Sequence, residues 1–84
     1  QEFKILAILW DASERNMGTL SAKGVSDRGV LLGLAIRHEN VRKVIRMRLG
    51  KYVETLTEQI GNNRIYRYKI SPSGGEYFVS KYLK

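Results

Sequence analysis

Residues 37–51 have the sequence R-H-E-N-V-R-K-V-I-R-M-R-L-G-K, in which cations and apolar residues alternate at helical spacing. The stretch holds six Lys or Arg residues and one acid, so it carries most of the formal net charge of +7 of this 84-residue chain. In a helix over residues 40–49, the aliphatic residues share one arc, while Arg42, Lys43 and Arg46 lie together on the opposite arc. Such a helix buries one face in a domain and presents cations on the other, and the natural partner of a concentrated positive surface is a polyanion.

The length and composition indicate one small domain. Apolar residues make up 43% of the chain, which favours a folded core over disorder. The absence of cysteine excludes a disulfide framework, a thiol nucleophile and a Cys-based zinc site, and it fits a reducing cytoplasm. The aliphatic run at residues 30–36 is too short to span a bilayer, and no secretory signal is visible. We therefore expect a cytoplasmic protein with no membrane partner, which would be nucleoid-associated if its polyanion partner is DNA.

The segments before the basic helix predict two further helices. The expected elements are a helix at residues 2–13, a loop at 14–25 with a short strand at 19–21, and a uniformly apolar helix at 29–36. Ser26 is the expected N-cap of the second helix, because a Ser side chain accepts hydrogen bonds from the free backbone N–H groups of a first turn. The turn at residues 37–40 is expected to be tight and to lack glycine.

The remaining third of the chain predicts a β-hairpin and a closing helix. Residues 51–60 are rich in β-branched and aromatic residues, residues 61–63 (G-N-N) suit a turn, and residues 64–70 alternate with period two. Ser71 followed by Pro is a typical helix start, so the closing helix is expected at residues 72–83.

The order of these elements resembles that of a winged helix-turn-helix domain. The stretches R-L-G-K-Y-V at 48–53 and R-Y-K-I-S-P-S-G at 67–74 look like the pattern of PadR-like and MarR-like regulators. In those regulators a recognition helix ends in Leu, a Gly starts the first wing strand, and a Tyr-x-Leu-Thr element opens the last helix. Here Ile70 stands for the Leu and Ser71 for the Thr.

This resemblance implies a single α+β domain at residues 1–84, with three helices, a two-stranded β wing and a C-terminal helix. It also implies a dimeric double-stranded DNA-binding protein, such as a sequence-preferring transcriptional regulator. Its basic helix would enter the major groove, and its wing would contact the DNA backbone. Small archaeal-type proteins that partition or package DNA are similar as well, so a protein that coats DNA is an alternative.

Side-chain chemistry identifies the candidate DNA contacts within this expected fold. Arg and Lys pair with phosphates, Arg also bonds guanine bidentately, and residues at a helix start commonly meet base edges. An Arg at a wing tip can enter a minor groove, and two further cations are expected along the DNA side of the wing. The full set is Arg37, Glu39, Asn40, Arg42, Lys43, Arg46, Lys51, Asn63, Arg64, Arg67 and Lys69. Arg48 falls within the apolar arc, and we expect it to snorkel or to pair with an acid.

The first helix is apolar nearly all round, which predicts burial on more than one side. A chain this short buries a modest core, so the second side is expected to form a two-fold interface with the closing helix of a partner copy. The residues expected at this homodimer interface are Phe3, Ile5, Ile8, Leu9, Phe78, Val79, Tyr82 and Leu83.

No catalytic or metal chemistry is predicted. His38 is the only histidine, and one His without clustered Cys or carboxylates makes no metal site. The sequence contains no phosphate-loop glycine pattern and no nucleophile beside a base, so we expect neither an enzyme nor a cofactor. Two other binding functions stay open, namely a winged helix that assembles proteins without binding DNA, and a protein whose tyrosines stack on RNA or single-stranded bases.

Overall fold

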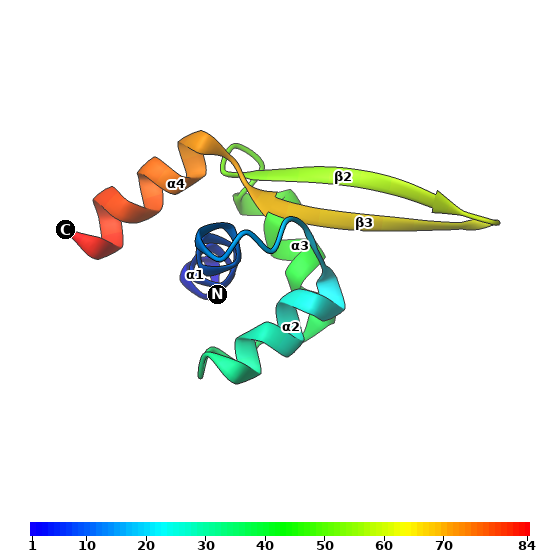
Figure 1. The fold of residues 1–84 in the computed structure, drawn as a ribbon, viewed down its shortest axis with the longest axis horizontal. Coiled ribbons are helices and arrows are strands. Elements are labelled where there is room, and N and C mark those ends of the chain that lie inside the picture. Colours follow the sequence, from blue (N-terminus) through cyan, green and yellow to red (C-terminus); the bar gives the residue numbers. More distant parts are fainter.

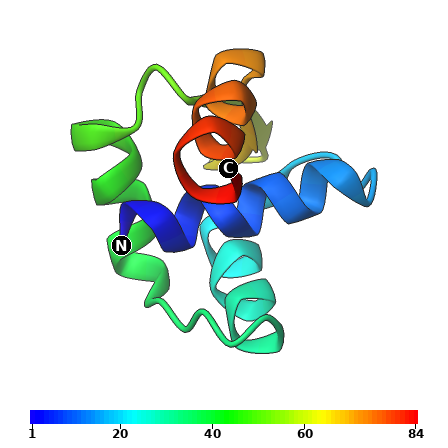
Figure 2. The same ribbon diagram turned by 90° about the vertical axis from the view of Figure 1, so that its left-hand side faces the viewer.

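Helix α1 (Glu2–Glu14) lies at the centre of the structure, a computed structural model that describes all 84 residues, and the other elements surround it (Figures 1 and 2). The architecture is α+β, with four helices and a three-stranded antiparallel sheet. The elements after α1 are β1 (Leu20–Ser21), α2 (Ala22–Leu31), α3 (His38–Arg48), β2 (Val53–Ile60), β3 (Asn63–Ile70), α4 (Pro72–Phe78) and a π-helical turn η1 (Val79–Leu83). The β2–β3 hairpin projects from the helices and makes the molecule elongated, with extents of 44 × 26 × 24 Å (Figure 1).

The core forms around α1 because its apolar residues recur on nearly every side of the helix. Every other helix and the sheet contribute side chains to this core, so α1 is covered within a single chain. The buried cluster comprises Ile5, Leu6, Ile8, Leu9, Val25, Ile36, Val41, Ile45, Leu49, Val53, Tyr68 and Phe78. The expectation that α1 keeps a wide apolar side for a partner is therefore wrong for most of its length.

Helix α2 lies earlier in the chain than the sequence predicted. It begins after Ser21, whose hydroxyl accepts a hydrogen bond from the Gly24 N–H at 3.1 Å, so Ser21 rather than Ser26 is the N-cap. It ends at Leu31, because Gly33 adopts a φ of +73°. The backbone of this turn forms a Schellman-type pair of bonds, from Leu34 N to the Gly29 carbonyl at 2.7 Å and from Gly33 N to the Val30 carbonyl at 3.3 Å.

The connection between α2 and α3 is consequently longer than expected and does contain a glycine. Two side chains fix its path: the Ser26 hydroxyl donates to the Ile36 carbonyl at 2.7 Å, and the Lys4 ammonium donates to the Ala35 carbonyl at 2.9 Å. Gly29 also approaches this segment closely, since a Cβ there would lie 2.6 Å from the Leu34 carbonyl oxygen. These contacts set the position of α3 relative to α1 and α2.

The sheet has the strand order β1-β3-β2, so it contains one strand more than the expected two-stranded wing. The predicted short strand at 19–21 is confirmed as β1, which pairs with β3 through Leu20 and Tyr68. The predicted hairpin is confirmed as well, and its turn is the dipeptide 61–62, in which Gly61 takes a φ of +60°. The pairing of β2 with β3 runs from Val53 opposite Ile70 at the base of the hairpin to Ile60 opposite Asn63 beside the turn.

The closing helix begins where the sequence predicted. The Ser71 hydroxyl accepts a hydrogen bond from the Gly74 N–H at 2.9 Å, and Pro72 occupies the first turn. The Ser71 and Ser73 hydroxyls also donate to the Lys51 carbonyl, each at 3.1 Å. These bonds hold the start of α4 against the start of β2.

Candidate nucleic-acid interface

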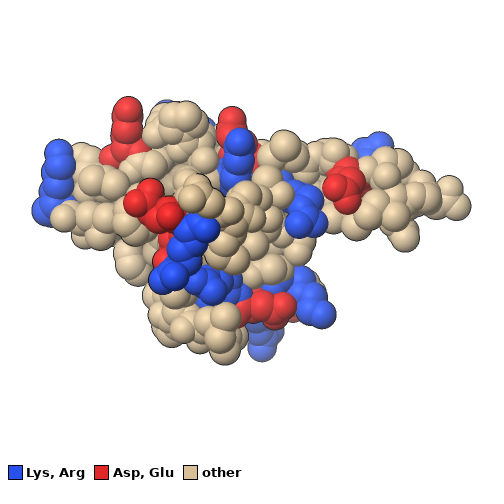
Figure 3. All heavy atoms as spheres, in the orientation of Figure 1, with Lys and Arg blue, Asp and Glu red and all other residues tan.

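The outward face of α3 carries three exposed cations, Arg42, Lys43 and Arg46, as the helical period predicted. On its inner face Val41 and Ile45 are fully or almost fully buried, at 0% and 2% exposure. Because the buried side chains fix the rotation of the helix, the three cations are held toward solvent. Figure 3 shows the side of the molecule in front of α3, where Lys and Arg side chains lie among Asp and Glu side chains over α1 and α2.

None of these three cations takes part in an ion pair. The one acid on the same face, Glu39, lies 3.0 Å from the Nδ1 atom of His38. Arg48 lies 3.6 Å from a carboxylate oxygen of Glu2, which confirms the expectation that it pairs with an acid. The positive charge at the centre of α3 is therefore not neutralised within the chain.

Arg42 links α3 to the hairpin. Its guanidinium lies 4.2 Å from the ring centroid of Tyr66 on β3, a cation–π contact that favours one orientation of the side chain. Next to it, burial raises the pKa of the Tyr68 phenol, and the nearby Arg42 charge opposes this shift. Tyr66 was not among the expected double-stranded DNA contacts, so its contact with a candidate site residue was missed from the sequence.

The hairpin has two chemically different faces. Side chains alternate along β3, and Tyr68 at 2% exposure is in the core, so the side that holds Tyr66 and Tyr68 faces the helices. Arg64 lies on this same side near the hairpin tip, opposite Gln59 of β2. It is exposed and has no ion-pair partner, so it extends the cationic surface of α3 along the hairpin.

Arg67 and Lys69, which were expected on the DNA side of the wing, lie on the side of the hairpin opposite to Tyr66 and Tyr68, and both already have partners within the chain. The Arg67 Nε donates to the Thr19 hydroxyl at 3.0 Å, and Lys69 lies 3.5 Å from a Glu54 carboxylate oxygen. The period-two alternation could have revealed this, because the core residue Tyr68 stands between them in the sequence.

The other expected contact residues lie at the margins of this surface. Arg37 is exposed at the N-terminus of α3 and makes no capping bond, whereas Asn40 is half-buried within the first turn. Lys51 is exposed in the turn between α3 and β2, and Asn63 is exposed at the hairpin tip. Together they frame a surface that runs from the start of α3 to the end of the hairpin.

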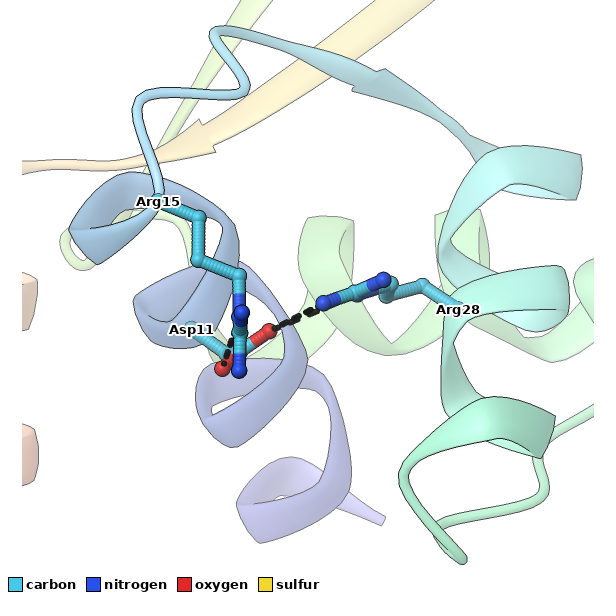
Figure 4. A network of polar contacts seen from close by, with 3 residues as sticks. All are labelled: Asp11, Arg15 and Arg28. Carbon is cyan, nitrogen blue, oxygen red and sulfur yellow. Dashed lines mark hydrogen bonds and ion pairs between the residues drawn. The ribbon is translucent and has the colours of Figure 1, made fainter.

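A separate polar network joins α1 to α2 away from this surface (Figure 4). Asp11 lies 3.1 Å from Arg15 and 3.1 Å from Arg28, one partner on each carboxylate oxygen. Burial alone would raise the pKa of Asp11, but the hydrogen bonds and charges of the two arginines outweigh it and hold the pKa below its ordinary value of 3.8. Because both arginines are already paired with Asp11, they are not part of the free cationic surface of α3.

Half of the expected interface residues are unavailable to a partner. Ile5, Ile8, Leu9 and Phe78 are each at most 3% exposed within the single chain. The accessible remainder comprises Phe3 at 41% exposure, Leu83 at 53%, and the half-buried Val79 and Tyr82. The rings of Phe3 and Tyr82 meet edge to face, with their centroids 4.8 Å apart.

No three His, Cys, Asp or Glu side chains lie close enough together to hold a metal ion. None of the helices has both the length and the apolar composition that crossing a membrane requires. Comparison of the chain with protein-family models, curated proteins and solved structures found no match.

Proposed function

We propose that this protein is a winged helix-turn-helix domain that binds double-stranded DNA in the cytoplasm, as a sequence-preferring transcriptional regulator. In this proposal α3 enters the major groove, and the β2–β3 hairpin is the wing that lies along the DNA backbone. The domain binds rather than catalyses, and it requires no cofactor.

The observation that carries the proposal is the unpaired charge on α3. Cations that already have acidic partners gain little from a phosphate, whereas Arg42, Lys43 and Arg46 are free to replace condensed counterions on DNA. Arg64 lies on the helix-facing side of the hairpin, so one duplex lying across α3 can also meet the wing. The order of the elements, from α2 through α3 to the hairpin, further supports a winged helix.

The direct test compares two triple variants that lose the same charge. Arg42→Gln/Lys43→Gln/Arg46→Gln removes the free cations of α3, and Lys69→Gln/Lys81→Gln/Lys84→Gln removes three cations elsewhere. Both changes lower the formal net charge of +7 by three. Fluorescence anisotropy with a labelled random duplex at low salt should show weak binding for the α3 variant and nearly unchanged binding for the control. Equal loss in both variants would indicate nonspecific attraction of a basic protein, and the assignment of α3 would be wrong.

We further propose that the protein acts as a homodimer through the accessible apolar residues at the start of α1 and the end of the chain. Phe3 and Leu83 are large and exposed, and Tyr82, which precedes Leu83 in the chain, packs edge to face against Phe3. A two-fold pair would place two copies of α3 on successive major grooves of an inverted repeat. Leu83→Glu should then give a monomer in light scattering, with weaker binding because the two half-sites are no longer linked. If light scattering shows that the parent protein is monomeric at tens of micromolar, the proposed homodimer is wrong.

A second candidate function, protein–protein assembly without DNA, is favoured by one observation. Val30 and Leu31 at the end of α2 are 66% and 75% exposed, which is unusual for two adjacent aliphatic side chains. An assembly module should show no duplex binding even at low salt. The number of protein molecules bound per duplex tests the other alternative, a protein that coats DNA. For such a protein, this number should rise with the length of the duplex.

A further inference from the structure

Met47 is an exposed apolar side chain beside the cations of α3. It lies on the last turn of α3, four residues after Lys43, and it lines a shallow hollow with three cations and one acid: Arg42, Lys43, Arg46 and Glu39. Its exposure is 70%, so most of this residue is open to solvent. The other methionine, Met17, lies in the loop after α1 at 41% exposure, and it is not part of that hollow.

The surroundings of Met47 restrict what can cover it. An apolar protein surface would have to bury Lys43 and Arg46 beside it, and burying unpaired cations costs more than covering one thioether gains. A nucleic-acid duplex can cover Met47 without leaving the neighbouring cations unpaired, because its phosphates pair with them. Within the major groove, the apolar group that the base edges offer is the C5-methyl of thymine.

We propose that Met47 contacts the C5-methyl group of thymine in the major groove and thereby makes the protein prefer thymine at one position of its site. The inference rests on the proposed DNA binding by α3. Lys43, one turn earlier on the same face, and Arg46, the preceding residue, anchor the helix to phosphates on either side of that base. The flexible, polarisable thioether of Met adapts to the methyl group without demanding one rigid geometry.

The first experiment removes the methyl group from the DNA and nothing else. A duplex selected from a random library is prepared with each thymine replaced in turn by deoxyuridine, which lacks only the C5-methyl. For the parent protein, one replacement per half-site should weaken binding by about fourfold, the effect of exposing one methyl-sized group. Met47→Ala should bind the thymine and uracil duplexes equally, and the matched control Met17→Ala should discriminate as the parent does.

The second experiment observes the two methionines directly. With methionine labelled by ¹³C at its methyl group, the protein gives two methyl signals, which Met17→Ala and Met47→Ala assign. Addition of the selected duplex should shift the Met47 signal and leave that of Met17 in place, and the uracil duplex should shift Met47 less. This readout does not depend on the size of the affinity change.

The outcomes separate the inference from the proposed function. Absence of duplex binding at low salt would overturn both. Binding with equal affinity for every uracil-substituted duplex, or with an unmoved Met47 signal, would overturn the thymine contact and leave DNA binding intact. A selected site without thymine would do the same. A Met47 signal that shifts with protein concentration in the absence of DNA would show that a second copy of the chain covers this side chain instead.

Discussion

The two faces of the hairpin allow a sharp test of how the wing would meet DNA. Arg64 and Arg67 lie three residues apart on β3, so they have opposite orientations. Arg64 is unpaired on the side that faces α3, and Arg67 is held by the Thr19 hydroxyl on the other side. We expect Arg64→Gln to remove one phosphate contact and Arg67→Gln to remove none.

The size of the effect follows from the number of free cations. If Arg42, Lys43, Arg46 and Arg64 each neutralise one phosphate, log K should fall against log salt with a slope of about −3.6, at about 0.9 per contact. Raising the salt from about 50 to about 200 mM would then weaken binding by about 150-fold. Three phosphate contacts remain after Arg64→Gln, so the slope should be about −2.7. The same rise in salt should then weaken binding by about 40-fold.

The measurement is a titration by fluorescence anisotropy at several salt concentrations, with the same duplex and three proteins. Circular dichroism should first show that both variants keep the parent's fold. The parent and Arg67→Gln should give parallel lines, and Arg64→Gln a shallower one. A shallower line for Arg67→Gln beside a parental line for Arg64→Gln would mean that the wing meets DNA through its outer face, and the orientation proposed for the duplex would be wrong.

Two further predictions concern the parts that hold α3 in place. Asp11→Asn should lower the free energy of unfolding by about 1 kcal/mol at neutral pH. Because the pKa of Asp11 is depressed below 3.8 in the folded protein, this difference should shrink as the pH falls through and below 3.8, as urea titrations at pH 7 and pH 3 would show. Gly29→Ala should cost about 1 to 3 kcal/mol in the same assay, since the added Cβ overlaps the Leu34 carbonyl, whereas Gly50→Ala, with open space around it, should cost far less.

The basic helix and the hairpin could be predicted from the sequence because each has a strict period. Burial of Val41 and Ile45 follows from the helical period, and the hairpin follows from alternation around a turn at Gly61. The second helix could not be placed in this way, because the run at 29–36 is apolar at every position and contains no period. Its end was nevertheless marked by Gly33, whose positive φ stops the helix inside the run.

The candidate site was predictable only as far as local periodicity reaches. Periodicity places the cations of α3 on one face, but it does not reveal which cations form ion pairs with acids elsewhere in the chain. Those ion pairs decide which positive charges are free to bind a partner. It also cannot say how much of α1 the rest of the chain covers. Ile5 and Phe78 were expected at an interface and are buried, because α4 folds back over α1 within the same chain.

The distribution of ion pairs connects the fold to the proposed function. Asp11, Glu2 and Glu54 each pair with a cation that lies off the centre of α3, and those pairs link α1 to α2, α1 to the end of α3, and β2 to β3. These three acids therefore stabilise the framework that presents α3, and none of them pairs with its central cations. If DNA binding depends on the absence of acidic partners for the central cations of α3, a new acid one turn from these cations should weaken DNA binding. It should leave the stability of the fold unchanged. Met47→Glu would introduce such an acid, and it should lower duplex affinity more than Met47→Ala does, with the same urea midpoint for both.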